Sequence, residues 1–186
     1  MRIISGIYKG RRLKCNNNLH IRPTTDRVKE YIFNILQEFP SNKMVCDLFS
    51  GSGNLGIEAL SRGANQIYFI DSSNESMRVL KKNIQILRIP ENHYQIIQND
   101  AIRFVKTNNT YFDLYLLDPP FNYPSLQDLI DYLFRNEVVS FNCMAVLEHE
   151  ISNPVNDYSG LYELIKQKKF GRSIISFMIK KGNYEN

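Results

Sequence analysis

The spacing of apolar residues predicts strands and helices that alternate along most of the chain. Short apolar runs are typical of buried strands, and apolar residues three and four positions apart are typical of helices with one buried face. Strands are predicted at residues 44–49, 67–70, 94–97, 112–117 and 143–147, and helices at 55–62, 74–87, 101–106 and 126–134. This alternation is typical of an α/β fold with a doubly wound, mostly parallel sheet.

The C-terminal part of the chain predicts two further strands. Residues 162–168 and 174–179 are strand candidates, and Phe170-Gly171-Arg172 between them has the composition of a turn. A short turn between two strands predicts an antiparallel hairpin. The expected sheet therefore has seven strands, and its C-terminal pair is an antiparallel hairpin.

The N-terminal part predicts a short β-arm followed by a helix. Residues 2–14 resemble two short strands around Ser5-Gly6, and their expected apolar anchors are Ile3, Ile7 and Leu13. Thr25 or Asp26 can cap a helix whose apolar positions continue at helical spacing to residue 39. We expect a single domain over residues 1–186, with residues 1–40 as an appendage to a core at 41–186.

Charge is distributed unevenly along the chain. The net charge is +4, and residues 1–14 contain basic side chains but no acidic one. Such an arm suits nucleic-acid binding, although basic runs are often only solvated surface. The basic residues of this segment are Arg2, Lys9, Arg11, Arg12 and Lys14.

Composition makes several other classes of protein unfavourable. No apolar run reaches the roughly 18 residues of a membrane helix, and the N-terminus has no signal-peptide pattern, so a cytoplasmic location is expected. The three cysteines and three histidines are scattered, which argues against a disulfide framework and predicts no metal site.

A glycine-rich segment follows the first predicted strand of the core. Gly51, Gly53 and Gly56 match G-x-G-x-x-G between a strand and a helix, and Asp71 ends the next strand. Taken literally, this pattern predicts a dinucleotide site, with the Asp71 carboxylate on the ribose hydroxyls. A nicotinamide-dependent oxidoreductase is therefore one possible interpretation.

Three carboxylates at successive strand ends favour a different cofactor. Asp47 lies inside the first strand, where a buried carboxylate is costly unless a cationic group such as an ammonium pairs with it. Asp71 and Asp100 follow the next two strands, and Asp118 opens an Asp-Pro-Pro-Phe segment. Together these features resemble class I S-adenosylmethionine-dependent methyltransferases, which have a Rossmann-like fold.

The resemblance to class I methyltransferases implies a set of cofactor-binding residues. In that family the glycine loop holds the methionine part of S-adenosylmethionine, the acid after the second strand holds the ribose, and an acid after the third contacts the adenine. The positions implied here are Asp47, Phe49, Gly51, Ser52, Gly53, Asp71, Asp100 and Ala101.

Asp118-Pro119-Pro120-Phe121 ends the fourth strand of the core. A strand followed by a stiff loop would explain it, because proline fixes φ and donates no hydrogen bond. The segment also resembles the Asp/Asn-Pro-Pro-aromatic motif of methyltransferases that modify exocyclic amines of nucleobases. This resemblance implies that the Asp118 carboxylate and the Pro119 carbonyl accept the amine N–H groups and that Phe121 stacks on a flipped base.

Further motifs narrow the resemblance to the RsmD family. They lie at residues 2–13, 22–27, 47–53, 58–63 and 118–121. The family methylates the N2 amine of a guanine in 16S rRNA of the small ribosomal subunit, at position 966 by family resemblance. The resemblance implies an assembled or partly assembled subunit as the substrate and places the motif with Arg22, Thr25 and Arg27 beside the active site. The charge of the arm adds Arg2, Lys9, Arg11 and Arg12 as expected RNA contacts, and we expect a monomer.

One departure and two further alternatives accompany this resemblance. Ser73 stands where many relatives carry a second acid, so ribose binding would depend on Asp71 alone. An adenine-N6 DNA methyltransferase is an alternative, because the Asp118 motif selects an amine rather than a base. A non-catalytic RNA-binding or ribosome-assembly module is another.

Overall fold

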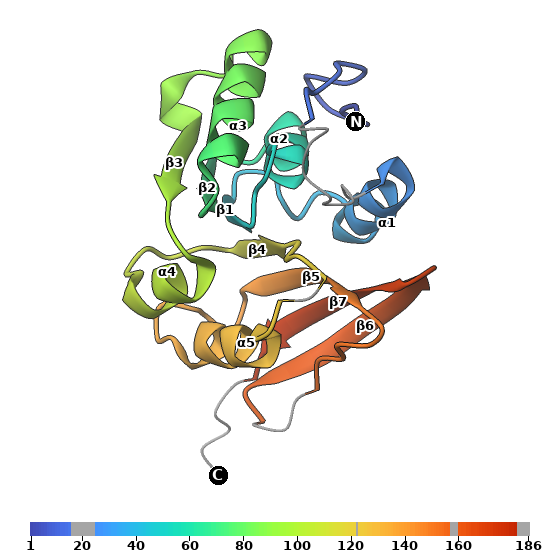
Figure 1. Ribbon diagram of the computed structural model, residues 1–186, viewed down its shortest axis with the longest axis vertical. Coiled ribbons are helices and arrows are strands. Elements are labelled where there is room, and N and C mark those ends of the chain that lie inside the picture. The colour runs from blue at the N-terminus through green and yellow to red at the C-terminus, as the bar shows by residue number, and fades with distance from the viewer. Residues whose placement is uncertain (16–24, 122, 157–159, 182–186) are drawn as a thin grey trace.

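A seven-stranded sheet forms the centre of the computed structural model, which describes residues 1–15, 25–121, 123–156 and 160–181 (Figure 1). The strand order is β3-β2-β1-β4-β5-β7-β6. β1 to β5 run parallel to one another, whereas β7 is antiparallel to both β5 and β6. The strands are β1 Met44–Leu48, β2 Gln66–Asp71, β3 Tyr94–Gln98, β4 Leu114–Leu117, β5 Met144–Glu150, β6 Tyr162–Phe170 and β7 Ser173–Lys180.

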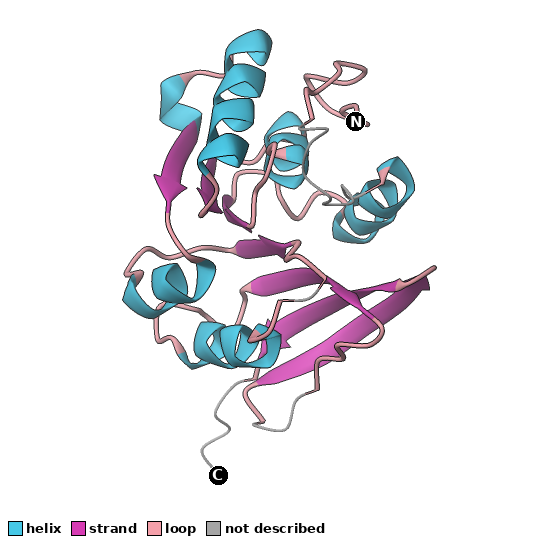
Figure 2. Ribbon diagram, viewed as in Figure 1, coloured by secondary structure: helices cyan, strands magenta, loops and turns pink. Residues whose placement is uncertain are grey.

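Helices cover both faces of this sheet (Figure 2). α1 to α3 pack on one face around residues such as Phe33, Leu60 and Leu80, and α4 and α5 pack on the other around Phe104 and Leu129. The helices are α1 Asp26–Leu36, α2 Asn54–Ser61, α3 Asn74–Leu87, α4 Ala101–Thr107 and α5 Leu126–Arg135, with a short 3₁₀ turn at Glu91–His93. The predicted doubly wound α/β fold with a C-terminal hairpin is therefore confirmed.

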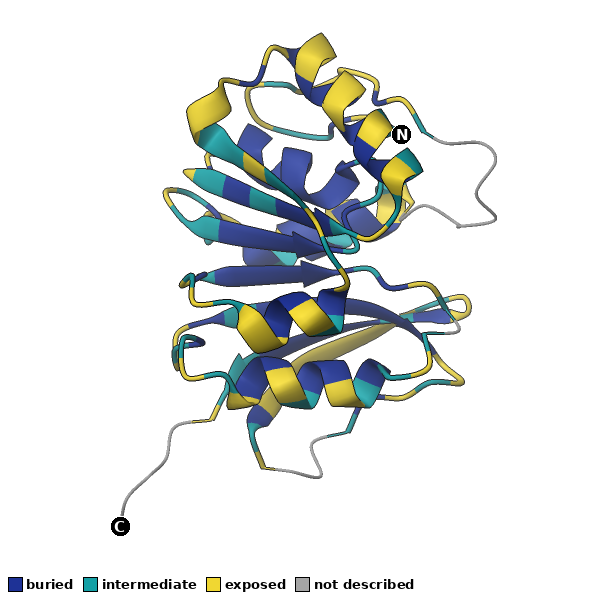
Figure 3. Ribbon diagram, turned by 60° about the vertical axis from the view of Figure 1, so that its left-hand side comes forward, coloured by how far each residue is buried: buried dark blue, intermediate teal, exposed yellow. Residues whose placement is uncertain are grey.

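The central strands are buried because helices shield both of their faces (Figure 3). All four residues of β4 are buried, which explains its unbroken apolar sequence. β5 continues three residues past its predicted end, to Glu150, because β7 pairs with it as far as Ser173. Parallel order brings the carboxyl ends of β1 to β4 to one edge of the sheet, where ligands bind in folds of this kind.

The N-terminal arm differs from the predicted pair of strands. It is a loop closed by one antiparallel bridge, Arg2 to Arg12, in place of two strands. Ile3 and Leu13 are buried as expected, but the prediction for Ile7 was wrong, since 79% of its surface is exposed. The chain turns at Gly6, which has a φ of 81°, and the backbone N–H of Ile7 then donates to the Ser61 carbonyl, 2.8 Å away. The Ile7 side chain consequently faces solvent.

Two features are absent from the segments that the structure describes. None of the helices in these segments is long and apolar enough to cross a membrane. Within the same segments, no group of three or more His, Cys, Asp or Glu side chains is placed to hold a metal ion.

Candidate active site

A cavity of about 270 Å³ lies at the carboxyl ends of the parallel strands. Ligand pockets in general measure roughly 300–1,000 Å³, so this volume is at their lower limit. The walls come from the loops after β1, β2, β3 and β4 and from the two ends of the N-terminal arm, Met1 and Cys15. Six of the predicted cofactor residues line it: Phe49, Gly51, Ser52, Asp71, Asp100 and Ala101. Asp118 and Pro120 line it as well.

The glycine loop after β1 is shaped by positive backbone angles. Gly51 and Gly53 have φ values of 53° and 83°, and Phe49 has a φ of 62°, which is unusual for a residue with a large side chain. A Cβ atom on Gly53 would lie 2.5 Å from a methyl carbon of Leu80. The third glycine has a packing role, since a Cβ atom on Gly56 would lie 2.4 Å from the Phe69 ring.

Asp71 joins the glycine loop to the end of β2. Its Oδ2 accepts a hydrogen bond from the backbone N–H of Gly51, and its Oδ1 accepts one from that of Ser73, both at 2.8 Å. Each carboxylate oxygen has a second lone pair, so Asp71 can still accept two ligand hydroxyl groups. Ser73 begins α3 as its N-cap, because its hydroxyl oxygen accepts from the N–H of Ser76 at 3.2 Å.

Asp100 has a local structural role beside its place in the cavity wall. It is the N-cap of α4, where its Oδ1 accepts a hydrogen bond from the Arg103 N–H at 2.9 Å. The residue is exposed, and the capping bond uses one of its two carboxylate oxygens. Asp100 can therefore cap the helix and bind a ligand at the same time.

Asp47 occupies a different position from the other two acids. It is buried beneath the glycine loop, does not line the cavity, and its Oδ2 accepts from the Gly56 N–H at 2.9 Å. Gly53 is also buried and absent from the cavity wall. Burial raises the pKa of Asp47 from 3.8 to about 7, and the Gly56 hydrogen bond opposes that rise. Its predicted contact with a cofactor ammonium stays a prediction.

The raised pKa of Asp47 predicts how stability depends on pH. Between about pH 4 and 7 the folded protein binds a proton at Asp47 that the unfolded chain has lost, so this residue lowers stability as pH rises. Asp47→Asn keeps an acceptor for Gly56 and cannot ionise. We expect its free energy of unfolding, relative to the parent, to increase by up to about 4 kcal/mol from pH 4 to 8. Urea unfolding of both proteins across this range measures it, and parallel curves would contradict it.

The segment after β4 places the aromatic residue Tyr123 in the cavity wall, and the predicted stacking of Phe121 on a base stays a prediction. Phe121 is half-buried and does not line the cavity. Tyr123 lines it instead, because its N–H donates to the Pro120 carbonyl at 2.9 Å and turns the chain back. Its ring meets the Phe49 ring edge-on, with centroids 5.0 Å apart. The sequence signal was available in principle, since Tyr123 follows the motif by two residues.

The remaining members of the Asp118 motif are placed by the sheet. Asp118 is half-buried, and its N–H lies 3.4 Å from the Leu48 carbonyl, which extends the pairing of β4 with β1. Pro119 is buried and absent from the cavity wall, whereas Pro120 is exposed and lines it. The acid is thus held at the sheet edge in the cavity that Asp71 and Asp100 also line.

Ser50 is a cavity residue that the sequence analysis missed. It is 6% exposed, lines the cavity, and its hydroxyl has no hydrogen-bond partner among the described residues. A buried polar group without a partner costs roughly 1–3 kcal/mol. The hydroxyl is therefore placed to bind a polar ligand atom, and this is the observation that best fits a cofactor in the cavity.

Those predicted RNA-contact residues that the structure describes lie outside the cavity. Arg2 pairs with Asp26 at 3.2 Å, and both side chains are exposed. Thr25 is the N-cap of α1, where its hydroxyl oxygen accepts from the Val28 N–H. Lys9 and Arg12 are exposed. Arg11 donates a hydrogen bond to the Ile86 carbonyl at 3.2 Å, and the Arg27 guanidinium lies 5.9 Å from the centre of the Phe170 ring. Arg22 lies outside the described residues.

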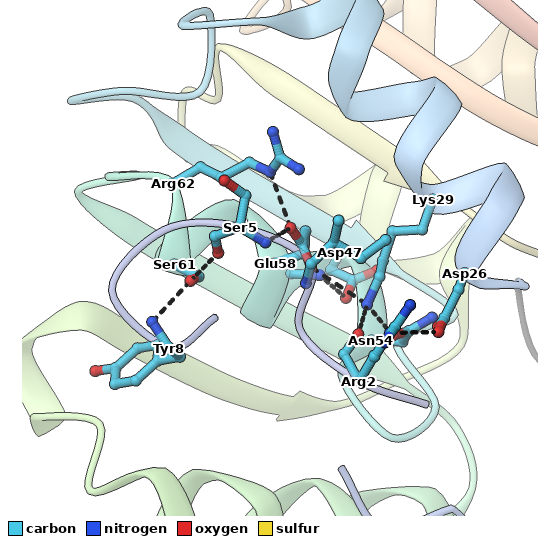
Figure 4. Close-up of polar contacts among 12 residues, drawn as sticks. Arg2, Ser5, Tyr8, Asp26, Lys29, Asp47, Asn54, Glu58, Ser61 and Arg62 are labelled. Atoms are coloured by element: carbon cyan, nitrogen blue, oxygen red, sulfur yellow. Dashed lines mark hydrogen bonds and ion pairs between the residues drawn. The ribbon is translucent and has the colours of Figure 1, made fainter. Parts of the chain in front are cut away.

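Buried polar side chains fasten the arm to α1 and α2 (Figure 4). The Glu58 carboxylate accepts from the N–H groups of Ile4 at 2.8 Å and Ser5 at 3.0 Å. It also pairs with Lys29, 3.3 Å away, and neither of these two side chains is exposed. Burial lowers the pKa of Lys29, and the charge of Glu58 opposes this. Lys29 also donates to the side chain of Asn54, 2.7 Å away, and Asn54 lines the cavity.

Asn83 of α3 links the arm directly to the glycine loop. Its side-chain amide donates to the carbonyls of Lys14 and Ser52, and its carbonyl oxygen accepts from the Lys14 N–H at 2.8 Å. Asn83 is buried, so these bonds are shielded from water. The arm and the loop therefore share anchors.

Comparisons with known proteins agree with this arrangement. The family described as Conserved hypothetical protein 95 matches residues 1–179. Ribosomal RNA small subunit methyltransferase D of Haemophilus influenzae is 35% identical over 96% of this chain and 92% of its own length. The protein of the same name from Escherichia coli K12 is 31% identical over 92% of this chain and 86% of its own length.

The chain belongs to the RsmD family. The solved structure of yhhF from Escherichia coli is similar to this chain, with a TM-score of 0.86 at 30% identity. The match covers 97% of this chain and 98% of that one. The ribosomal protein L11 methylase of Lactobacillus delbrueckii shares the fold, with a TM-score of 0.69 at 17% identity over 90% of this chain and 84% of that one. The Rossmann-like class I methyltransferase fold is thus confirmed.

Proposed function

We propose that this chain is an S-adenosylmethionine-dependent methyltransferase that modifies the exocyclic N2 amine of a guanine in small-subunit rRNA. The observation that carries the proposal is the position of Asp118 in the same cavity as Asp71, Asp100 and the Ser50 hydroxyl, which has no partner within the described segments. Family membership and the names of its relatives support rRNA as the substrate. The choice of guanine N2 comes from the RsmD resemblance.

Residues from three loops would hold the cofactor. When bound, S-adenosylmethionine supplies a methyl group activated by a positively charged sulfur. Asp71 binds the ribose hydroxyls with its free lone pairs, and Asp100 contacts the adenine. Gly51 and Ser52 approach the methionine part closely, and Ser50 gives it a hydrogen bond.

Asp118 prepares the amine for attack. The lone pair of a guanine N2 is delocalised into the ring, so the free amine is a poor nucleophile. Acceptance of its two N–H bonds by the Asp118 carboxylate and the Pro119 carbonyl favours a tetrahedral nitrogen and directs the lone pair outward. A carboxylate next to the nitrogen also stabilises the positive charge that develops there, and this electrostatic effect is large in a site shielded from water.

The base must leave its stack to reach Asp118. A cavity of this kind excludes a base that is still paired, so the guanine is flipped or already unpaired. Tyr123 lines the cavity on the side of the Asp118 motif and is the first candidate for stacking, and Phe121 is the second. The basic arm binds RNA phosphates, and this affinity falls as the salt concentration rises.

Methyl transfer to defined substrates tests the proposed function. The purified chain is incubated with radiolabelled S-adenosylmethionine and small subunits that lack the modification, free 16S rRNA, and DNA. We expect label in the small subunit or its rRNA, and nucleoside mapping should place it on guanine N2. Label mainly on adenine in DNA would favour the alternative enzyme, and no transfer to any substrate would favour a non-catalytic module.

Ser50→Ala should weaken cofactor binding without destabilising the free protein. The variant loses one hydrogen bond to the cofactor, so we expect the affinity to fall by roughly 2- to 10-fold. The free protein should be as stable as the parent or more stable, because an unsatisfied hydroxyl has been removed. Calorimetric titration and urea unfolding measure the two effects. Loss of stability with unchanged affinity would show that Ser50 is only structural.

A further inference from the structure

Basic side chains gather on the C-terminal hairpin, which is not part of the N-terminal arm. Lys166, Lys168 and Lys169 of β6 are exposed, and Arg172 follows in the turn. Glu163 is the one acidic residue between positions 162 and 172. β6 is the last strand of the sheet, so its outer edge faces solvent.

The sheet register brings the turn of this hairpin to the edge that holds the active site. Ser173, at the start of β7, pairs with both Phe170 and Glu150. Glu150 is the carboxyl end of β5, and β5 runs parallel to β4, which ends just before Asp118. Three strand spacings of about 4.8 Å separate β4 from β6, so the hairpin lies roughly 14 Å to one side of β4.

α1 adds a basic residue to the same region. Phe170 packs edge-on against Tyr31, with ring centroids 5.0 Å apart, and the Arg27 guanidinium lies over the Phe170 ring. Lys166 and Lys168 pair with Phe177 and Ile175, whose side chains belong to the core on the α1 face. Because residues directly opposite one another share a face, both lysines lie on the same side of the sheet as Arg27. We call Arg27, Lys166 and Lys168 the hairpin patch; Arg172 adjoins it but forms an ion pair with Glu150.

The N-terminal arm and the hairpin patch lie on opposite sides of Asp118. The arm is anchored on α2 at Ser61 and on α3 at Asn83, and these helices follow β1 and β2. The hairpin adjoins β5 at the other side of β4 (Figure 1). A nucleotide at Asp118 would therefore have basic surface on both flanks.

We propose that the hairpin patch binds the phosphates on one flank of the target nucleotide, while the arm binds those on the other. The inference rests on the proposed function, which supplies RNA as the ligand. Lysines on an edge strand also discourage aggregation through strand pairing. Protection against aggregation does not explain Arg27, because it lies on a helix and extends the patch toward the active site.

A matched pair of double variants tests the proposal. Lys166→Gln/Lys168→Gln removes two charges from the patch. Lys106→Gln/Arg135→Gln removes two exposed charges near the carboxyl ends of α4 and α5. These helix ends lie at the amino ends of the parallel strands, opposite the edge that holds the active site. Binding of small-subunit rRNA is measured as a function of salt for the parent and both variants. We expect the slope of log K against log salt to fall by about 1.4 to 1.8 for the patch variant and to stay unchanged for the control.

Three outcomes would overturn the proposal. An unchanged slope for the patch variant would show that the lysines do not contact phosphates, and equal losses in both variants would show only a general effect of charge. If the patch variant aggregates, the same binding measurement is made on Arg27→Gln, because Arg27 does not lie on the edge strand. An unchanged salt slope for Arg27→Gln would also overturn the proposal. Failure of the parent to methylate any rRNA would instead contradict the proposed function, because the binding measurement needs no catalysis.

Discussion

Replacement of Asp118 by alanine is expected to reduce methyl transfer by roughly 10²- to 10³-fold, the loss seen when one preorganised electrostatic partner of a transition state is removed. Asp118 lines the cavity and is held there by the pairing of β4 with β1. The carboxylate has no predicted role in holding the ribose or adenine, which fall to Asp71 and Asp100. The affinity for S-adenosylmethionine should therefore change little.

Two further variants make this prediction specific. Asp118→Asn keeps one carbonyl oxygen that can accept an N–H bond, so it should recover part of the lost rate. Asp128→Ala removes an exposed carboxylate in the first turn of α5, outside the cavity, and should leave the rate unchanged. Single-turnover transfer and calorimetric titration measure rate and affinity separately. A folded Asp118→Ala protein that no longer binds the cofactor would contradict this separation of roles.

The strand-end acids show which parts of the site could be predicted from the sequence. A carboxylate directly after a parallel strand must lie at the ligand-binding edge, and together with the class I resemblance this assigned Asp71 and Asp100 to the cofactor site. Asp47 lies within its strand, so the direction of its side chain depends on the strand's pleat and on the path of α2. The structure turns it toward Gly56 rather than the cavity.

The loops show what the sequence could not provide. Phe49 has a positive φ that no residue preference predicts, and it places the Ser50 hydroxyl in the cavity. Tyr123 lines the cavity because one backbone hydrogen bond to Pro120 turns the chain back, which the sequence did not indicate. The Ile7 prediction failed for a similar reason, since an apolar residue at a tight turn can face solvent. Side-chain direction in loops depends on contacts with distant segments.

The pairing of Lys29 with Glu58 could not be predicted from the sequence either. Helical spacing places Lys29 among the buried positions of α1, but a lysine there would ordinarily be assigned to the surface. Its partners come from the arm, from Asn54 and from Glu58 on α2, which are distant in the sequence. The pair connects the arm that we propose binds RNA to the wall of the cavity, so its loss should affect both.

Glu58→Ala is expected to destabilise the protein by about 3–5 kcal/mol, because it leaves Lys29 charged, fully buried and without its ionic partner. It also removes the acceptor for the N–H groups of Ile4 and Ser5. Urea unfolding measures the loss of stability. Hydrogen exchange should show that the Ile4 and Ser5 amides lose protection before the strands of the sheet do.

Two comparisons identify the buried charge as the cause. Lys29→Met/Glu58→Ala removes the buried ammonium as well and leaves only Arg62, whose side chain is 16% exposed, without its Glu58 partner, so the double variant should regain part of the stability that Glu58→Ala loses. Arg2→Ala removes an ion pair whose side chains are 68% and 41% exposed, and this should change stability by less than about 1 kcal/mol. If the double variant were less stable than Glu58→Ala, the hydrogen bonds of Lys29 to Asn54 and to the Arg2 carbonyl would outweigh the cost of its unpaired charge. Lys29 would then stabilise the arm chiefly as a hydrogen-bond donor.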